Sequence, residues 1–312
     1  MTTTDFLVIG ESVADIVRTP DSPDVTHPGG SPANVAYGLA RLGRETALLT
    51  ELGADPAGEL IAAHLRGAGV ELLADSRTAA PTPSALVTLD GAGKADYAFD
   101  IRWTLGWERA EIPISPHHVH FGSIAALADP GAATVLKLVS RLRGYATVSY
   151  DPNVRAELLG DPAEAIGKVE LCVALSDIVK ASDEDVRWLY PDRSEESVAS
   201  AWLRAGPALV VITRGGDGAV AYTSDRTIYA NSRRVAVADT VGAGDSFMSA
   251  ILDALATEER IGAEARTGLA TMTEPEIATV LSHAATAAAL TVSRAGANPP
   301  TAAELRMAGA MS

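Results

Sequence analysis

The segment DTVGAGDSF, residues 239–247, carries the strongest chemical signal in the sequence. It follows the strand-like run RRVAVA and opens a stretch with the apolar spacing of a helix. Glycines at such a turn let the backbone N–H groups of Gly242, Ala243 and Gly244 approach an anion, whose charge the helix dipole favours. Asp245 beside them would accept a proton while charge develops on a phosphoryl group. A simple helix cap explains the spacing of Asp245 equally well.

A second glycine pair, in GGSPAN at residues 29–34, also precedes a helical pattern. Ser31 and Pro32 are favoured at a helix start, so Asn34 falls in the first turn. Its amide offers a donor and an acceptor to sugar hydroxyls, for which Asp15 would be a bidentate acceptor. A tight turn explains Asn34 as well as ligand binding does, and Asp15 alone fits an ordinary loop acid better.

Two further polar clusters follow apolar runs that resemble buried strands. TRGGDGA, residues 213–219, could hold a nucleotide, although Gly-Asp-Gly between strands is first of all typical of a hairpin turn. DPNVR, residues 151–155, places a carboxylate, an amide and a guanidinium at a strand end, where they would suit a substrate or a phosphate.

Several well-known catalytic motifs are absent from the sequence. It contains no Gly-x4-Gly-Lys-Ser/Thr, no Gly-x-Gly-x-x-Gly after the first strand, no Gly-x-Ser-x-Gly and no His-Glu-x-x-His. His117, His118 and His120 crowd together, but strand alternation would divide them between two faces. We therefore expect no metal site there, and no P-loop or dinucleotide-binding enzyme.

The elements that must position these residues alternate between strand and helix. DFLVIG, TALLTELG, HVHFGSI, ATVSYDPN, DIVKASD and ALVVITRGG are apolar runs that end at Gly, Asp or Ser. Amphipathic stretches such as residues 32–43 lie between several of them. The pattern predicts an α/β protein with three α/β/α layers and a mainly parallel central sheet. Ligands of such sheets bind beyond the carboxyl ends of the strands, where the polar clusters lie.

Two segments, at about 11–28 and 83–112, interrupt the alternation. Both have strand-like alternation, and the second predicts a hairpin that turns at residues 90–93. We expect the two segments to pair as a small accessory sheet. Because nothing resembles a linker, we expect residues 1–312 to form a single domain.

The composition of the chain limits the classes of partner that it can bind. The chain has 312 residues, a formal net charge of −15 and one cysteine, Cys172. The negative charge argues against a nucleic-acid partner, and an ATP site would need local compensation from helix N-termini and a divalent cation. The absence of internal disulfides, of a basic leader and of any long apolar run predicts a cytoplasmic protein without a membrane partner.

In this order, the motifs resemble the ribokinase-like carbohydrate kinases, which include the minor bacterial phosphofructokinases. GGSPANVAYGLARLG is similar to the N-terminal signature of that family, and DTVGAGDSF is similar to its C-terminal signature. DPNVR, VKASDED, TRGGDGA and AALTVSRAGA extend the match almost from end to end. GGSPAN, HFGSI, DPNVR and VKASDED are most similar to fructokinases.

The resemblance implies a role for each matched residue around the sugar. Asp245 would be the catalytic base beside the anion hole, and Asp15, Gly30 and Asn34 would bind sugar hydroxyls. Arg155 would lie near the substrate or the transferred phosphate. The small sheet would be a lid that closes over the sugar and contributes to a homodimer interface.

On the nucleotide side, the resemblance implies that Thr213, Gly215 and Gly218 line the ATP site. Members of the family commonly need Mg²⁺. Where much of the family has Asn-x-x-Glu in the magnesium–phosphate network, this chain has Ser182 and Asp185. Asp185 keeps the charge on a shorter arm, so we expect the network to survive.

Many members of the family are also stimulated by K⁺. The matching positions are Asp239, Val241, Arg294 and Gly296. A monovalent-cation site formed by these two loops is therefore a further expectation.

The sequence thus predicts an ATP-dependent kinase of a small sugar, with fructose as the first choice. 2-Keto-3-deoxygluconate is the main alternative, because Arg102 in the lid could bind its carboxylate, followed by ribose or a nucleoside. A catalytically silent sugar-binding regulator on the same fold is the alternative of another class, and the intact Asp245 argues against it. A nicotinamide-dependent dehydrogenase is a more distant alternative.

Overall fold

The computed structural model describes residues 2–19, 22–73, 76–89, 95–106 and 112–310. Nine strands within these ranges form one sheet in the order β15-β14-β13-β12-β11-β10-β1-β4-β6. Its seven strands from β13 to β6 are parallel to their neighbours, and the β13-β14-β15 edge is antiparallel. In chain order the strands are β1 (Thr2–Ile9), β4 (Thr46–Leu49), β6 (Glu71–Leu72), β10 (Ile114–Gly122), β11 (Thr147–Asp151), β12 (Ile178–Ser182), β13 (Leu209–Thr213), β14 (Ala219–Tyr222) and β15 (Thr227–Ala230).

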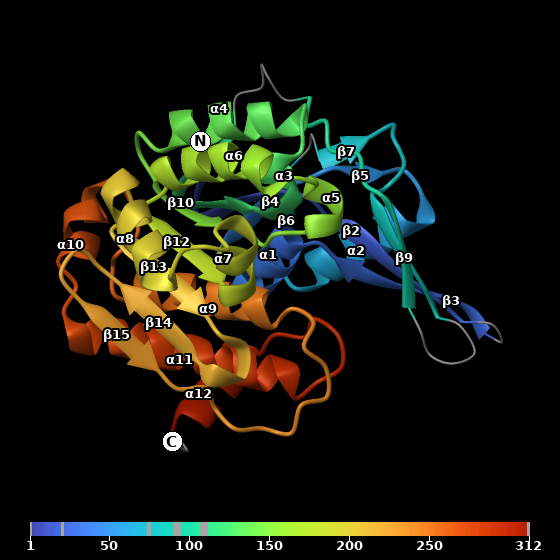
Figure 1. Ribbon diagram of the computed structural model, residues 1–312. Coiled ribbons are helices and arrows are strands. Elements are labelled where there is room, and N and C mark those ends of the chain that lie inside the picture. Colours follow the sequence, from blue (N-terminus) through green and yellow to red (C-terminus); the bar gives the residue numbers. More distant parts are fainter. Residues whose placement is uncertain (1, 20–21, 74–75, 90–94, 107–111, 311–312) are drawn as a thin grey trace.

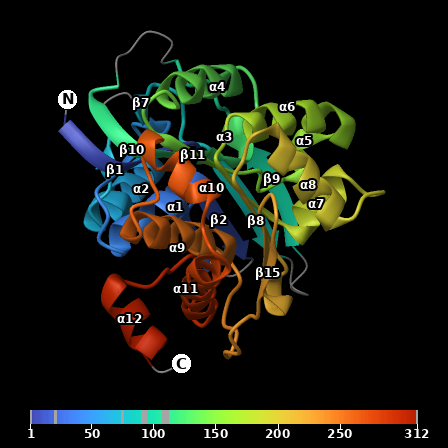
Figure 2. The ribbon, with the colours of Figure 1, turned by 90° about the vertical axis from the view of Figure 1, so that its left-hand side faces the viewer.

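Helices cover both faces of this sheet (Figures 1 and 2). One layer contains α3 (Ser123–Leu127), α4 (Gly131–Leu142), α5 (Ala156–Leu159), α6 (Pro162–Ala174), α7 (Asp183–Leu189) and α8 (Glu195–Ala205). The other contains α1 (Ser31–Arg41), α2 (Pro56–Gly67), α9 (Ala243–Thr257), α10 (Arg266–Ala270), α11 (Glu274–Val292) and α12 (Ala302–Ala310). The predicted three-layer α/β/α class is confirmed.

Alternation along the central strands explains the two cores. Leu7 and Ile9 of β1 pack into the core beneath α4 and α6, whereas Phe6 and Val8 pack into the core beneath α1 and α9. All four side chains are fully buried. A strand buried on both faces is apolar at every position, which is why DFLVIG predicts a central strand.

The two interrupting segments pair, as expected, into a separate four-stranded sheet in the order β3-β2-β8-β9. Strands β2 (Val13–Thr19) and β8 (Ser84–Leu89) are parallel, and each is antiparallel to its outer neighbour, β3 (Ser22–Gly29) or β9 (Ala95–Asp100). The predicted turn at residues 90–93 and the predicted stretch 107–111 lie outside the described residues. A short sheet of β5 (Leu52–Gly53) and β7 (Arg77–Thr78) lies nearby in Figure 1.

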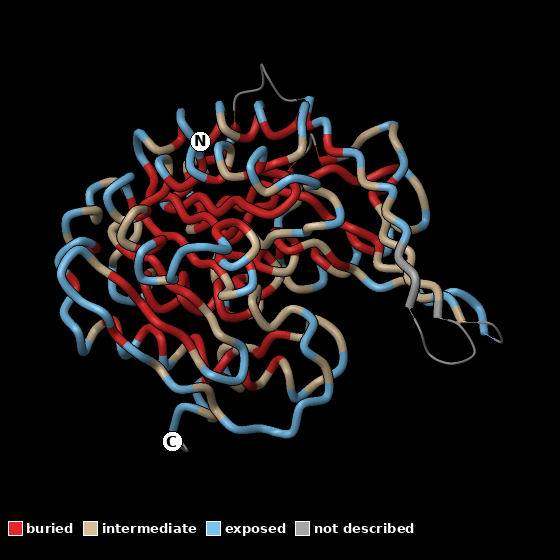
Figure 3. The backbone as a smooth tube through the Cα atoms, in the orientation of Figure 1, coloured by how far each residue is buried: buried red, intermediate tan, exposed pale blue. Residues whose placement is uncertain are grey.

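The small sheet projects from the side of the main body (Figure 1). Burial differs accordingly, because the central strands are buried along their length while most of β3 is exposed (Figure 3). Few of its side chains belong to either core. The small sheet therefore has little packing that would resist movement against the main body.

The carboxyl ends of the parallel strands meet at one edge of the large sheet. Strands β1, β10, β11, β12 and β13 end there at residues 9, 122, 151, 182 and 213. The loops that follow them carry most of the polar clusters singled out in the sequence. Among the described residues, no helix has both the length and the apolar character needed to span a bilayer.

Candidate active site

Asp245 lies in the first turn of α9, three residues after the N-cap. That N-cap is Gly242, which has a left-handed φ of 74°, and no side chain caps the helix. The Asp245 carboxylate instead accepts hydrogen bonds from Ser31 Oγ at 2.6 Å and from Asn34 Nδ2 at 2.9 Å, both on α1. The interpretation of Asp245 as a helix cap is therefore wrong. Its carboxylate is held between two helices.

Helix α1 lies against α9 because small residues permit close packing. A Cβ on Gly38 of α1 would come within 2.5 Å of Ser249 Oγ on α9. Gly30, with φ 96°, begins α1, and its carbonyl accepts the Asn34 N–H at 2.9 Å. Two helix N-termini thus lie beside one carboxylate. Their dipoles favour negative charge there, as an anion site requires.

The predicted anion hole occupies the turn from Gly242 to Gly244. The glycine at 242 is required, because a Cβ there would come within 2.7 Å of the Ala297 Cβ. The Ala243 N–H contacts the Thr240 carbonyl at 3.3 Å, which is long for a hydrogen bond. A phosphate oxygen would compete with this weak bond rather than with a strong one.

A buried ion pair that sequence reasoning missed lies on the sheet beneath this turn. Lys180 Nζ, near the end of β12, is 2.7 Å from Asp151 Oδ2, at the end of β11. The two side chains are 5% and 1% exposed. Burial is the main cause that raises the pKa of Asp151 to about 6, although Lys180 opposes it. The available signal was a lysine at the end of an otherwise apolar strand.

Asp15 lies on β2 of the small sheet, with its carboxylate against Gly29. A Cβ on Gly29 would come within 2.0 Å of Asp15 Oδ2, so the first glycine of GGSPAN makes room for this carboxylate. Burial raises the pKa of Asp15 to about 6, while Arg155 and His27 lower it. Asp15 and Asn34 thus flank the turn that contains Gly30.

Arg155 is exposed after β11, and its guanidinium donates to Asn153 Oδ1 at 2.8 Å. Its charge acts on both Asp15 and Glu11, a second residue that the sequence analysis missed. Glu11 is buried after β1, accepts the Ala125 N–H at 2.9 Å, and has a pKa raised by burial. The main sheet and the small sheet therefore both contribute charged groups to this edge.

The segment from Thr213 to Gly218 connects β13 to its antiparallel neighbour β14. Residues 215–217 form a 3₁₀ turn, and Gly218 has φ 91° with no room for a Cβ beside the Ala230 carbonyl. The hairpin interpretation of Gly-Asp-Gly is confirmed. Thr213 and Gly215 are accessible at the same strand edge as the other candidates.

Asp185 and Ser182 form a capping box at the start of α7. One carboxylate oxygen accepts the Ser182 N–H at 2.8 Å, and the other accepts the Val154 N–H at 2.8 Å. Asp185 is 7% exposed, and its charge acts on both Asp151 and Lys180. The shortened acid thus stays beside the buried pair, but its oxygens already accept backbone N–H groups.

The four residues expected to hold K⁺ lie in two adjacent loops. Asp239 joins these loops, since its carboxylate accepts the Val241 N–H at 3.0 Å and the Gly296 N–H at 2.9 Å. These two bonds are the main causes that lower the pKa of Asp239. Arg294 pairs with Glu304 at 2.7 Å, so its carbonyl rather than its guanidinium would serve a cation.

The pfkB family carbohydrate kinase profile matches residues 3–304. The chain belongs to this family. A fructokinase of Rhizobium leguminosarum bv. trifolii is 37% identical over 232 residues, which are 73% of this chain and 71% of the relative. The predicted sugar kinase is confirmed by the family and by these relatives.

Solved structures agree with the family assignment. A fructokinase from Xylella fastidiosa with bound ATP has a TM-score of 0.85 and 25% identity, covering 99% of this chain and 98% of that one. A fructokinase from Vibrio cholerae O395 in a fructose-, ADP- and calcium-bound form has a TM-score of 0.80 and 25% identity, covering 97% of this chain and 98% of that one. These relatives support the prediction that this pfkB-family enzyme is an ATP-dependent sugar kinase.

Arg102 differs from the other candidates of this pfkB-family kinase. It follows β9 and contacts Asp100 at 3.7 Å, and its side chain is 74% exposed. Among the described residues, its ion-pair partner is thus another exposed residue of the small sheet.

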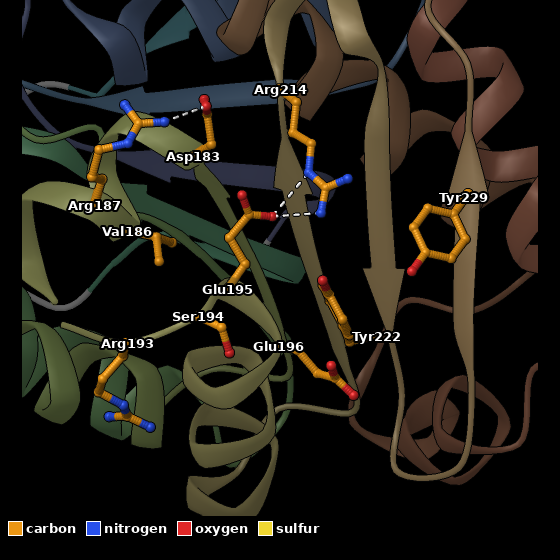
Figure 4. Close-up of a pocket in the computed structure, with 10 residues that line it drawn as sticks. All are labelled: Asp183, Val186, Arg187, Arg193, Ser194, Glu195, Glu196, Arg214, Tyr222 and Tyr229. Carbon is orange, nitrogen blue, oxygen red and sulfur yellow. Dashed lines mark hydrogen bonds and ion pairs between the residues drawn. The ribbon is translucent and has the colours of Figure 1, made fainter. Parts of the chain in front are cut away.

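A surface pocket of about 430 Å³ is lined by α7, the start of α8, Arg214 and the strands β14 and β15 (Figure 4). Arg214 binds Glu195 there at 2.9 and 2.7 Å, and Arg187 pairs with Asp183 at 2.8 Å. None of the candidate sugar or catalytic residues lines this pocket. Four of its charged side chains thus pair with one another, whereas the candidate sugar-binding and catalytic residues lie elsewhere.

Proposed function

We propose that this enzyme transfers the γ-phosphoryl group of ATP to a hydroxyl of fructose, with Asp245 as the general base. The observation that carries the proposal is the Asp245 carboxylate at the α9 N-terminus, held by Ser31 and Asn34. Such a carboxylate can take a hydroxyl proton beside N–H groups that stabilise a phosphoryl anion. The fructokinase relatives support fructose as the acceptor.

The reaction needs one bond to form and one to break. The sugar oxygen bonds to the γ-phosphorus as the bond from that phosphorus to the bridging oxygen of ADP breaks, and the hydroxyl proton passes to Asp245. The N–H groups of residues 242–244 would stabilise the equatorial oxygens. Closure of the small sheet would exclude water, which competes with the sugar as acceptor.

Mg²⁺ is proposed to accompany ATP. In the described part of the chain, no three His, Cys, Asp or Glu side chains cluster as a metal site. Asp185 nevertheless fits an outer-sphere role, because its oxygens retain lone pairs beyond the two N–H groups they accept. Bound Mg²⁺ would offset phosphate charge, while Thr213, Gly215 and Gly218 would position the nucleotide.

We also propose a homodimer through the small sheet and a cytoplasmic location. Strand β3 supports the first, because it lies at an edge of that sheet and Val25 on it is 50% exposed. Exposed edges and apolar side chains favour pairing with another chain. Cys172, free and buried, fits a reducing compartment.

Fructose is expected to give the highest kcat/KM in an ADP-release screen that also contains 2-keto-3-deoxygluconate, ribose, tagatose and adenosine. Replacing Arg102 by alanine should leave the fructose value unchanged, because fructose has no carboxylate for this exposed guanidinium to bind. A much higher value for 2-keto-3-deoxygluconate, lost in Arg102→Ala, would contradict the choice of fructose. Sugar binding in calorimetry without any ADP release would instead indicate a silent regulator.

Asp15→Ala is expected to weaken fructose binding far more than ATP binding, since lost hydrogen bonds to buried hydroxyls typically cost about 1–3 kcal/mol. Because the pKa of Asp15 is raised to about 6, its carboxylate is ionised above that pH and loses acceptor capacity below it. Fructose affinity should therefore fall as the pH drops through about 6, and this dependence should be weaker in Asp15→Ala.

Asp24→Ala is the matched control on the same sheet, because Asp24 is exposed and pairs with Arg18. It should leave the fructose Kd unchanged in calorimetry. An unchanged Kd in Asp15→Ala as well would return Asp15 to the loop-acid interpretation.

Potassium is expected to raise kcat above the value in a large organic cation at matched ionic strength. Asp239 holds the two candidate loops together, and one of them leads directly into the anion hole. A cation bound there would fix the start of α9. Equal rates in both salts would count decisively against the cation site.

A further inference from the structure

Lys180 is a buried cation without a role in the phosphoryl transfer described above. Its alternation along β12 places it on the sheet face that also carries Ile178, which packs in the core beneath α9. Asp151 holds its ammonium at 2.7 Å. Burying such a charge is costly, and a purely structural site is often as stable with apolar residues. The cost of burial therefore favours a functional role for Lys180 over a purely structural one.

The ammonium lies directly against the predicted anion hole. A Cβ built on Gly244 would come within 3.1 Å of Lys180 Nζ, nearer than most real Cβ contacts. The glycine at 244 therefore lets the ammonium approach the backbone of the α9 start. The same ammonium interacts electrostatically with Asp245 and Asp185. The ammonium therefore lies at the start of α9, within electrostatic range of both carboxylates.

The ammonium also has donor capacity to spare. It carries three N–H groups, and in the described part of the chain Asp151 is its hydrogen-bond partner. The charged side chains that act electrostatically on this cation are the acids Asp151, Asp185 and Asp245. A triphosphate entering such a site needs a positive group near the oxygens on which charge develops.

We propose that Lys180 is a further catalytic residue. Its ammonium binds the transferred phosphoryl group from the side of the sheet, while the N–H groups of residues 242–244 bind it from the start of α9. Asp151 is the positioning residue that holds the ammonium in place. The inference rests on the proposed function, because it assumes that the phosphoryl group lies at the α9 start.

Lys180→Met tests the contact by comparing ligands with and without a γ-phosphate. The variant should bind a non-hydrolysable ATP analogue about tenfold or more weakly, but should bind ADP within about threefold of the wild type. Its kcat should fall about 10²-fold, as is typical for loss of one donor to a reacting anion. The KM for fructose should stay within about threefold. A merely structural lysine would lower the melting temperature without changing the ratio of the two affinities.

Lys168→Met is the matched control. Lys168 pairs with Asp129 at the same distance, 2.7 Å, but the pair is exposed. The nucleotide affinities and kcat of the Lys168→Met enzyme should equal those of the wild type. Lys180→Met leaves the buried Asp151 without its counter-ion. The double variant Lys180→Met/Asp151→Asn therefore repeats the affinity measurements with both side chains neutral. A wild-type ratio of analogue to ADP affinity in these folded variants would overturn the proposal.

The native protein provides a test that does not depend on folding of a variant. The lysines of the chain are Lys94, Lys137, Lys168 and Lys180, so ¹⁵N-labelled side chains give few signals. The Lys180 ammonium signal should shift more with ADP–beryllium fluoride than with ADP, and the absence of that difference would also overturn the proposal. Lack of sugar phosphorylation by the wild type would contradict the proposed function itself, and is measured separately.

Discussion

Replacing Asp245 by asparagine is expected to lower kcat by about 10²–10⁴-fold, the usual contribution of a general base, while both substrates still bind. Asparagine keeps the shape of the side chain but cannot accept the hydroxyl proton. The hydrogen bonds of the carboxylate can also be kept. The new amide oxygen can accept from Asn34, and the new amide nitrogen can donate to Ser31, whose hydroxyl both donates and accepts. The variant should therefore fold.

The melting temperature should change little, because Gly242 rather than Asp245 caps α9. The variant loses the favourable effect of a negative charge in the first turn, about 0.3–1 kcal/mol. Glu164→Gln measures that loss alone, since Glu164 is an exposed first-turn acid of α6, far from the site in sequence and role. Retention of more than about a third of the wild-type kcat in Asp245→Asn, with chemistry rate-limiting, would show that Asp245 is not the base.

The large sheet could be predicted from the sequence because its strands are apolar on both faces. Residues 6–9 illustrate this, since they fill two cores by simple alternation. The turn at residues 242–244 could be predicted too, because glycine adopts the left-handed φ that the backbone has at residue 242 more readily than other residues do. Both features are set by residues that are close together in the sequence.

Contacts between distant segments could not be predicted in the same way. Asp245 and Ser31 form a hydrogen bond although they are 214 positions apart in the sequence, and neither motif indicates which residue the other will contact. Lys180 and Asp151 follow different apolar runs in the sequence, and they form a pair only because β11 and β12 are parallel neighbours. Arg102 likewise has a partner that its sequence motif does not indicate, since its exposed guanidinium lies 3.7 Å from Asp100.

Replacing Gly242 by alanine is expected to lower kcat by about 10²-fold or more in a protein that still folds. The new Cβ would come within 2.9 Å of the Ala297 Cα, a backbone atom that cannot rotate away. The start of α9 must then move, and the N–H groups of the anion hole move with it. Loss of one such donor typically costs about 10²–10³-fold in kcat, and misplacing several should cost at least as much as the lower value.

Gly43→Ala separates this displacement from the cost of the backbone conformation. Gly43 has φ 88°, similar to the 74° of Gly242, but nothing lies within 4 Å of its Cβ position. Both variants therefore carry the penalty of a left-handed alanine, about 1–2 kcal/mol, and should lose a few degrees in thermal unfolding. The kcat should fall only in Gly242→Ala. If both variants keep the wild-type kcat, the turn at Gly242 does not position the groups that stabilise the phosphoryl anion. A loss in Gly242→Ala alone would instead locate those groups at the N-terminus of α9, because the two substitutions differ in the collision with Ala297.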